Sequence, residues 1–163
     1  METDIKSYNK INRIIWFSIL IVMILLTVVV FILNRLQVFE QIPEMLTVGE
    51  ILFMGAVALA IAILILKRSV FRLDKITATA LKRNNQEESE IFALQQIRRN
   101  YIILWMLSET IGIIGFIFYI FTVNFVNYLL FMVVSLYSLA INFPREEIIR
   151  ICLENLRQPG RIT

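Results

Sequence analysis

The chain has 163 residues, 58% of them hydrophobic, and a net charge of +3, with its charged residues in blocks between long uncharged stretches. Soluble domains are nearer half apolar, with charges throughout, so the composition excludes an ordinary soluble protein and indicates an integral membrane protein. Histidine is absent and Cys152 is the only cysteine. These counts exclude an intrachain disulfide and the usual zinc, haem and iron–sulfur sites. We expect no cofactor and no metal, and we interpret the small positive excess as a topology signal and not as a nucleic-acid surface.

Two apolar segments in the first half of the chain are long enough to cross a bilayer as helices. The first is residues 14–33, IIWFSILIVMILLTVVVFIL, and the second is residues 46–66. A helix needs about 20 apolar residues to span a hydrocarbon core about 30 Å thick. The first segment is too long for a secretory signal peptide and no small-residue cleavage site follows it. We therefore expect it to be retained as a span.

Residues 67–100 follow the second span and contain neither proline nor glycine. Apolar residues at helical spacing continue from span two and lead into span three. This pattern predicts that both spans project into the cytoplasm as a long helical hairpin, with its turn in the polar run NNQEES, residues 84–89. We expect most of its charges to be solvated, and docking to a partner is the alternative.

The third and fourth spans are residues 101–122 and 124–143. Because only Thr122 to Asn124 separate them, they must form a tight antiparallel hairpin. Aromatic residues near this turn are typical of an outer interface belt.

Residues 144–159 predict a short amphipathic helix after the fourth span. Pro144 suits the first turn of a helix, and Glu146 and Glu147 suit the positive end of its dipole. Arg150 and Glu154 are spaced for an i,i+4 ion pair. One face carries the apolar residues, which are Ile148, Ile149, Cys152, Leu153 and Leu156. We expect this helix to end at Gly160 and to lie on the inner leaflet or against a partner.

The basic residues fix the expected orientation. If four helices alternate across the membrane, all 16 Lys and Arg residues except Arg35 fall on one side. The positive-inside rule then places both termini and the middle hairpin in the cytoplasm, and Trp16 and Trp105 near the inner interface. The sequence thus predicts an all-α fold in one domain: a four-helix bundle in the cytoplasmic membrane, with a cytoplasmic hairpin extension and a C-terminal amphipathic helix.

Apart from Glu50, which heads span two at the outer interface, Glu109 is the only carboxylic acid inside a predicted span. It lies eight residues past Tyr101, about 12 Å of helix rise below the inner surface. A charge at that depth costs at least about 2.5–3.5 kcal/mol, and the residues expected at matching depth are not basic: Val22 or Met23, Ala60 and Ser135. We therefore expect a neutral carboxyl that donates a hydrogen bond to Ser135 or Tyr137.

Three roles for Glu109 stay open. The carboxyl can serve as a hydrogen-bonding strut between helices. It can bind a proton or a sodium ion, with Thr110 and Ser135 as further ligands. It can also line a cavity for a lipid or another substrate. Small residues predict close helix packing nearby; they are Gly55, Ala58 and Ala62 on span two, and Ser108, Gly112 and Gly115 on span three.

The segment SETIGIIGFIFYIF, residues 108–121, resembles the ion-binding helix of the proteolipid subunit c of rotary ATP synthases. In those helices a Glu is followed by small residues and by a Gly, and Glu109, Thr110, Gly112 and Gly115 stand in comparable positions. The alternating alanines of residues 55–62, GAVALAIA, resemble the glycines of the partner helix. The resemblance covers spans two and three and implies an ion-binding hairpin whose loop faces the cytoplasm. The loop here is longer, and spans one and four are additional.

The sequence contains no nucleophile–base pair, no phosphate-binding loop and no carboxylate pair with catalytic spacing. We therefore do not expect an enzyme. We expect a non-catalytic subunit or scaffold of a larger membrane complex, whose partners are the lipid bilayer and either other subunits or further copies of itself. The alternatives are proton or sodium binding or translocation through Glu109, and a small transporter-like protein with its own cavity.

Overall fold

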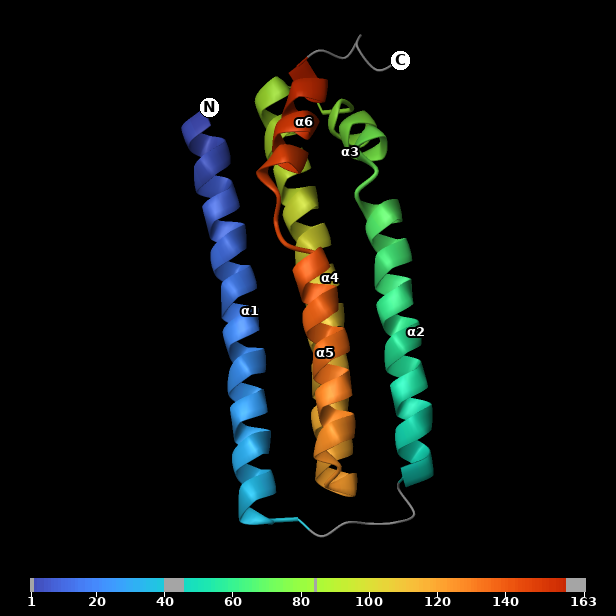
Figure 1. Cartoon of the computed structure of the whole chain (residues 1–163). Helices are drawn as coiled ribbons and strands as arrows, with labels where there is room; N and C mark the ends of the chain where they lie inside the picture. Colours follow the sequence, from blue (N-terminus) through green and yellow to red (C-terminus); the bar gives the residue numbers. More distant parts are fainter. Residues whose placement is uncertain (1, 40–45, 84, 158–163) are drawn as a thin grey trace.

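The computed structural model describes residues 2–39, 46–83 and 85–157, and within these ranges all regular structure is α-helix. The helices are α1 (Glu2–Leu36), α2 (Leu46–Val70), α3 (Leu73–Ala80), α4 (Gln86–Thr122), α5 (Phe125–Ile141) and α6 (Glu146–Arg157) (Figure 1). α1, α2, α4 and α5 contain stretches long and apolar enough to cross a membrane. The predicted all-helical class with four long apolar helices is confirmed. We call the end that carries α3, α6 and the start of α1 the α6 end.

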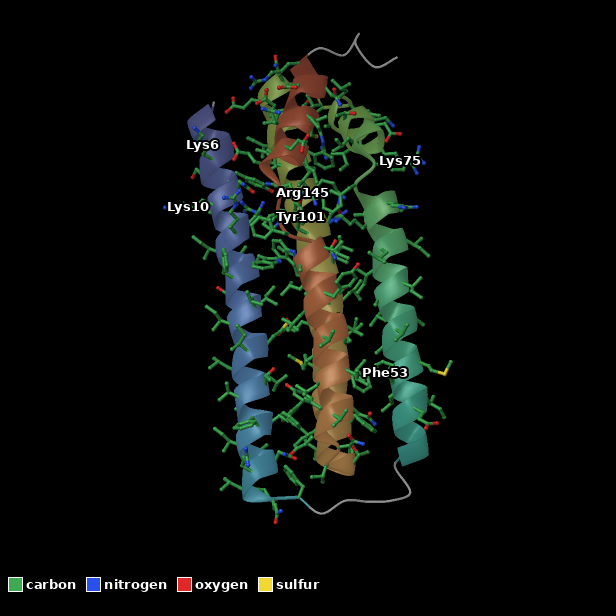
Figure 2. All side chains as sticks on the ribbon, in the orientation of Figure 1. Lys6, Lys10, Phe53, Lys75, Tyr101 and Arg145 are labelled. Atoms are coloured by element: carbon green, nitrogen blue, oxygen red, sulfur yellow. The ribbon has the colours of Figure 1, made fainter. Side chains whose placement is uncertain are left out.

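The antiparallel pair of α4 and α5 forms the centre of the arrangement. α1 contacts both of these helices from one side and α2 contacts both from the other, as Figure 1 shows. Within the described residues, α1 and α2 do not contact each other. Phe53 of α2 reaches the central pair, with its ring centroid 5.4 Å from that of Phe131 on α5 (Figure 2). The two outer helices therefore do not support each other directly: each packs on the central pair, and α1 also contacts α6.

α4 turns three neighbouring faces to the three other long helices, and the buried residues of each face repeat every seven positions. One row, Leu104, Ile111 and Phe118, lies toward α2, and a second row, Tyr101, Ser108, Gly115 and Thr122, lies toward α5. The third row, Trp105, Gly112 and Tyr119, lies between α5 and α1. α1 also has a row of buried residues at seven-residue spacing, which are Asn9, Trp16, Met23 and Val30. A seven-residue repeat is typical of long helices that pack at a shallow angle.

The end of α5 is held by side chains from the other three long helices. Trp16 Nε1 of α1 donates to the Leu139 carbonyl at 3.0 Å, and Trp105 Nε1 of α4 donates to the Asn142 carbonyl at 2.8 Å. Lys67 Nζ of α2 donates to the Ile141 carbonyl at 2.6 Å. The last carbonyls of a helix have no partner within the helix. The Leu139 carbonyl also accepts from the backbone N–H of Asn142 at 3.1 Å. Lys67 and Trp105 therefore complete the end of α5, and all three donors fix α1, α2 and α4 around it.

The predicted hairpin of residues 67–100 is only partly correct. α4 runs unbroken from Gln86 to Thr122, but α2 ends at Val70 and the short helix α3 follows after a bend. The bend has a tertiary cause. Asn100 Nδ2 donates to the Val70 carbonyl at 2.9 Å, and the Phe71 ring packs against Tyr101 at 4.6 Å between centroids. Because the free carbonyl is satisfied from α4, α2 can end without a glycine or proline.

The turn of this hairpin also lies earlier than predicted. α3 ends at Ala80, and α4 begins at Gln86 after Asn85, so residues 86–89 are the first turn of α4 and not part of the loop. Asn84 lies outside the described residues. Ser89, which the prediction placed in the turn, donates its hydroxyl to the Asn85 carbonyl.

α6 has the predicted amphipathic pattern, but its apolar face is covered by the chain itself. Its buried residues are Ile149, Cys152, Leu153 and Leu156, and α6 contacts α1, α3 and α4. Arg157 donates to both carboxylate oxygens of Glu90 on α4, at 2.8 and 3.0 Å. The expectation that this face lies on the inner leaflet or on a partner is therefore wrong. The predicted Arg150–Glu154 pair forms at 3.9 Å, and Gly160 lies outside the described residues.

We predict that Lys67→Met destabilises the protein while Arg68→Met does not. Methionine keeps most of the side-chain length but leaves the Ile141 carbonyl without its donor, at an expected cost of about 1–2 kcal/mol. Arg68 is exposed and makes no hydrogen bond or ion pair within the described residues, so its loss should change stability by less than about 0.5 kcal/mol. Unfolding midpoints of the detergent-purified variants measure the difference. Equal midpoints would show that the α5 end does not depend on Lys67.

Candidate functional site

Glu109 is the strongest candidate because of its surroundings on α4. No other Asp, Glu, Lys or Arg occurs in residues 14–33, 51–66, 101–122 or 124–143. Its side chain is half-buried, like those of Ile102 and Phe116 one heptad before and after it. Ile102 and Phe116 pack against the core that α4 shares with α1. The same helical row therefore places Glu109 at the edge of the contact between α4 and α1.

The level of Glu109 along α1 follows from two hydrogen bonds between the parallel helices α1 and α4. Arg98 Nε donates to Asn12 Oδ1 at 3.2 Å, and Tyr119 hydroxyl donates to Asn34 Oδ1 at 3.4 Å. Both pairs are offset by almost the same number of residues, which sets Glu109 level with Met23. Met23 is apolar and offers the carboxyl no donor, and it is one of the two α1 residues that the sequence placed level with Glu109.

Glu109 makes no hydrogen bond and no ion pair with any residue that the structure describes. The predicted bond to Ser135 or Tyr137 is therefore wrong. Ser135 lies fully buried between α4 and α5 and donates to the Ser108 carbonyl, while Tyr137 is 64% exposed. Successive residues of a helix point about 100° apart. Because Ser108 faces α5, the next residue, Glu109, points away from α5.

The proposed ion ligands do not converge. Thr110 is exposed and donates its hydroxyl to the Met106 carbonyl of its own helix at 2.8 Å. Ser135 points into the contact between α5 and α4. Neither the Thr110 hydroxyl nor the Ser135 hydroxyl forms a hydrogen bond with Glu109. Among the described residues, no group of three His, Cys, Asp or Glu side chains could hold a metal ion. Glu109, Thr110 and Ser135 thus form no closed ligand set within one chain.

A buried row of polar side chains lies between α4 and α5. Ser108 hydroxyl donates to the Leu104 carbonyl at 2.8 Å and lies 3.2 Å from the Ser138 hydroxyl. Asn142 Nδ2 donates to the Ser138 carbonyl at 2.8 Å. The sequence interpretation included Ser108 and Ser135 but missed Ser138 and Asn142. Their spacing from Ser135, at i+3 and i+7, places all three on one helix face and is the signal that could have found them.

The predicted packing residues behave differently on the two helices. On α4, a Cβ at Gly115 would lie 2.4 Å from Phe131 Cβ of α5, and one at Gly112 would lie 3.3 Å from Met132 Sδ. These glycines, with Ser108, let α4 and α5 approach closely. On α2 the small residues face outward: Gly55, Ala58 and Ala62 are exposed. Nothing lies within 4 Å of a Cβ at Gly55.

Pockets occur toward the α6 end, away from Glu109. Three of them have volumes of about 560, 510 and 400 Å³, and Glu109 lines none of the three. Comparison of the chain with protein-family models, with curated proteins and with solved structures gave no match. The functional interpretation therefore rests on the geometry of the chain.

We predict opposite effects for the same substitution at two glycines. Gly115→Ala forces its methyl group into Phe131 and should cost about 1–3 kcal/mol of stability. Gly55→Ala meets no atom and should leave stability unchanged or raise it, because alanine is the better helix former. Thermal unfolding of both variants in the same detergent tests the pair. An unchanged midpoint for Gly115→Ala would contradict the close contact of α4 with α5.

Proposed function

We propose that the chain is an integral membrane protein whose α6 end lies in the cytoplasm. In the most apolar 18-residue segments of α1 and α2, only 17% and 11% of the segment is buried within the protein. Such large apolar faces are unfavourable in water but suit a lipid environment. Apart from Arg35, every basic residue of the described ranges lies toward the α6 end, which the positive-inside rule assigns to the cytoplasm.

Cysteine labelling in intact cells tests this orientation. Burial raises the pKa of Cys152 to about 11, so its thiol stays protonated and unreactive near neutral pH. We expect Gln86→Cys, at the exposed start of α4, to react with a membrane-impermeant maleimide only after the cells are opened. Val38→Cys, which lies at the other end of the molecule and is 54% exposed in the wild type, should react before opening. The reverse pattern would contradict the proposed topology.

We further propose that the protein is a non-catalytic subunit or scaffold of a membrane assembly. The observation that carries this proposal is the half-buried Glu109, which has no partner in its own described chain. In a bilayer, neither lipid tails nor Met23 can offset the cost of this polar group. A neighbouring transmembrane helix with a hydrogen-bonding group can do so, and such contacts are a known source of helix association in membranes.

The outer face of α2 supports the same proposal independently. Gly55, Ala58 and Ala62 lie on one exposed face at spacings of three and four residues. Small residues at such spacing let a second membrane helix approach closely. The neighbour can be another copy of this chain or a different subunit, and both give a complex larger than the monomer.

Two substitutions of Glu109 test the subunit proposal. Glu109→Gln keeps shape and hydrogen bonding, so it should assemble like the wild type, whereas Glu109→Leu removes the polar contact and should shift the protein toward the monomer. Thr110→Val is the matched control, because the Thr110 hydroxyl is already bonded within α4. The mass of each variant, purified in a mild detergent, gives the readout. A wild type that is strictly monomeric, with no co-purifying protein, would overturn the proposal.

The same variants separate assembly from ion binding. An ion carrier with Gln at position 109 would assemble normally but lose ion-dependent activity, since an amide cannot titrate. In that case a carbodiimide, which attacks a protonated carboxyl in apolar surroundings, should modify the wild type, and sodium should protect it if sodium is the ion. Assembly lost only in Glu109→Leu, with no carbodiimide reaction in the wild type, favours the structural contact.

A further inference from the structure

The break between α2 and α3 creates a pocket of about 510 Å³ that is also bordered by α4. Its apolar part includes Ile76, which is 5% exposed, and the Phe92 ring. The Asn100–Val70 hydrogen bond holds α4 beside the end of α2 at this point. The pocket is thus a direct consequence of the bend that separates α2 from α3.

The charged side chains of this pocket are all basic. Arg72, Lys75 and Arg99 line it, and no Asp or Glu does. Arg72 donates to Asp74 at 3.1 Å. Lys75 and Arg99, by contrast, form no ion pair within the part of the chain that the structure describes. Figure 2 shows Lys75 on the outer side of α3. Two free cations beside an apolar wall favour an anionic group attached to an apolar one.

A second, apolar groove lies along α2, over residues that precede those of α2 in the first pocket. It has a volume of about 560 Å³, with Lys67, Arg68 and Phe71 toward the α6 end and Ile61, Leu64 and Ile65 farther down the helix. Ile61 and Ile65 are 53% and 66% exposed, and they lie on the same helical face as Ser69, which lines the upper pocket. A molecule with an anionic head and a long apolar tail therefore matches both parts.

We propose that this pair of pockets binds an anionic glycerophospholipid of the cytoplasmic leaflet, with its phosphate at Lys75 and Arg99 and an acyl chain along Ile61 and Ile65. The inference rests on the proposed membrane orientation, which puts the end of α2 at the level of the headgroups. Basic pockets at the cytoplasmic ends of membrane helices are suited to such headgroups. A soluble phosphate or an acidic peptide would use the cations but leave the apolar groove empty.

Native mass spectrometry of the detergent-purified full chain tests the site. The protein is titrated with phosphatidylglycerol and with phosphatidylcholine of identical acyl chains. We expect the wild type to bind phosphatidylglycerol more tightly, and the double substitution Lys75→Gln with Arg99→Gln to weaken that binding by about 25-fold, if each basic residue contributes about fivefold. Phosphatidylcholine binding should stay the same.

The matched control is the double substitution Lys82→Gln with Arg150→Gln, which removes the same net charge from exposed positions outside both pockets. It should retain the preference of the wild type. Equal losses in both double variants, or no loss in either, would overturn the site. If the Lys75/Arg99 variant does not fold, the two single substitutions decide, each with an expected loss of about fivefold.

Competition distinguishes a lipid from a free anion. Glycerol phosphate added at the concentration of the lipid should not displace phosphatidylglycerol, because it lacks the acyl chain. Displacement at equal concentration would overturn the role of the groove. Failure of the membrane proposal has a different signature: the protein would then appear in the soluble fraction of cells broken without detergent.

Discussion

The carbonyl groups at the end of α5 impose the constraint on which the arrangement of the long helices depends. A helix that ends among apolar side chains leaves carbonyls whose burial without a donor is costly. Trp16, Lys67 and Trp105 supply the donors, one from each of the other long helices. α1 and α2 do not touch within the described residues, yet both are fixed in register because each one reaches the same helix end. The sides of these helices that point away from the central pair are left exposed.

The α6 end follows from that constraint. After α5, the backbone N–H of Arg145 donates to the Tyr101 hydroxyl at 3.2 Å (Figure 2), and this bond directs the chain along the part of α4 beyond its apolar segment. α6 then buries its apolar face there, and its last residue, Arg157, is bound to Glu90. The ring of Tyr101 also packs against Phe71, beside the break in α2. One tyrosine thus links the start of α6 to the bend that forms the pocket proposed to bind a lipid.

The sequence was sufficient for features that depend on local pattern and insufficient for those set by contacts. Apolar length predicted four long helices, and the three residues Thr122 to Asn124 predicted a tight hairpin. The end of α2 at Val70 could not be predicted, because its cause is the side chain of Asn100, thirty residues away. The level of Glu109 beside Met23 of α1 was correct. Its expected bond to Ser135 was wrong, because the close contact of Gly115 with Phe131 sets the rotation of α4 and turns Glu109 away from α5. The stripe on α6 was recognised, while the helices that cover it were not.

Most buried polar groups of the described residues are paired within the chain, with Asn12 Nδ2 and Asn142 Oδ1 as the exceptions, whereas several polar groups on the outer faces are unpaired. The serines between α4 and α5 and the carbonyls at the end of α5 are bonded within the chain, whereas Glu109, Lys75 and Arg99 have no such partner among the described residues. In the proposed orientation, depth decides what can complete each of them. Lipid tails provide no hydrogen-bonding group at the level of Glu109, so its partner must come from another protein helix. Lys75 and Arg99 lie where phosphate groups are abundant, so a lipid can satisfy them without any protein partner. The two surfaces therefore call for different molecules, and loss of one should leave the other intact.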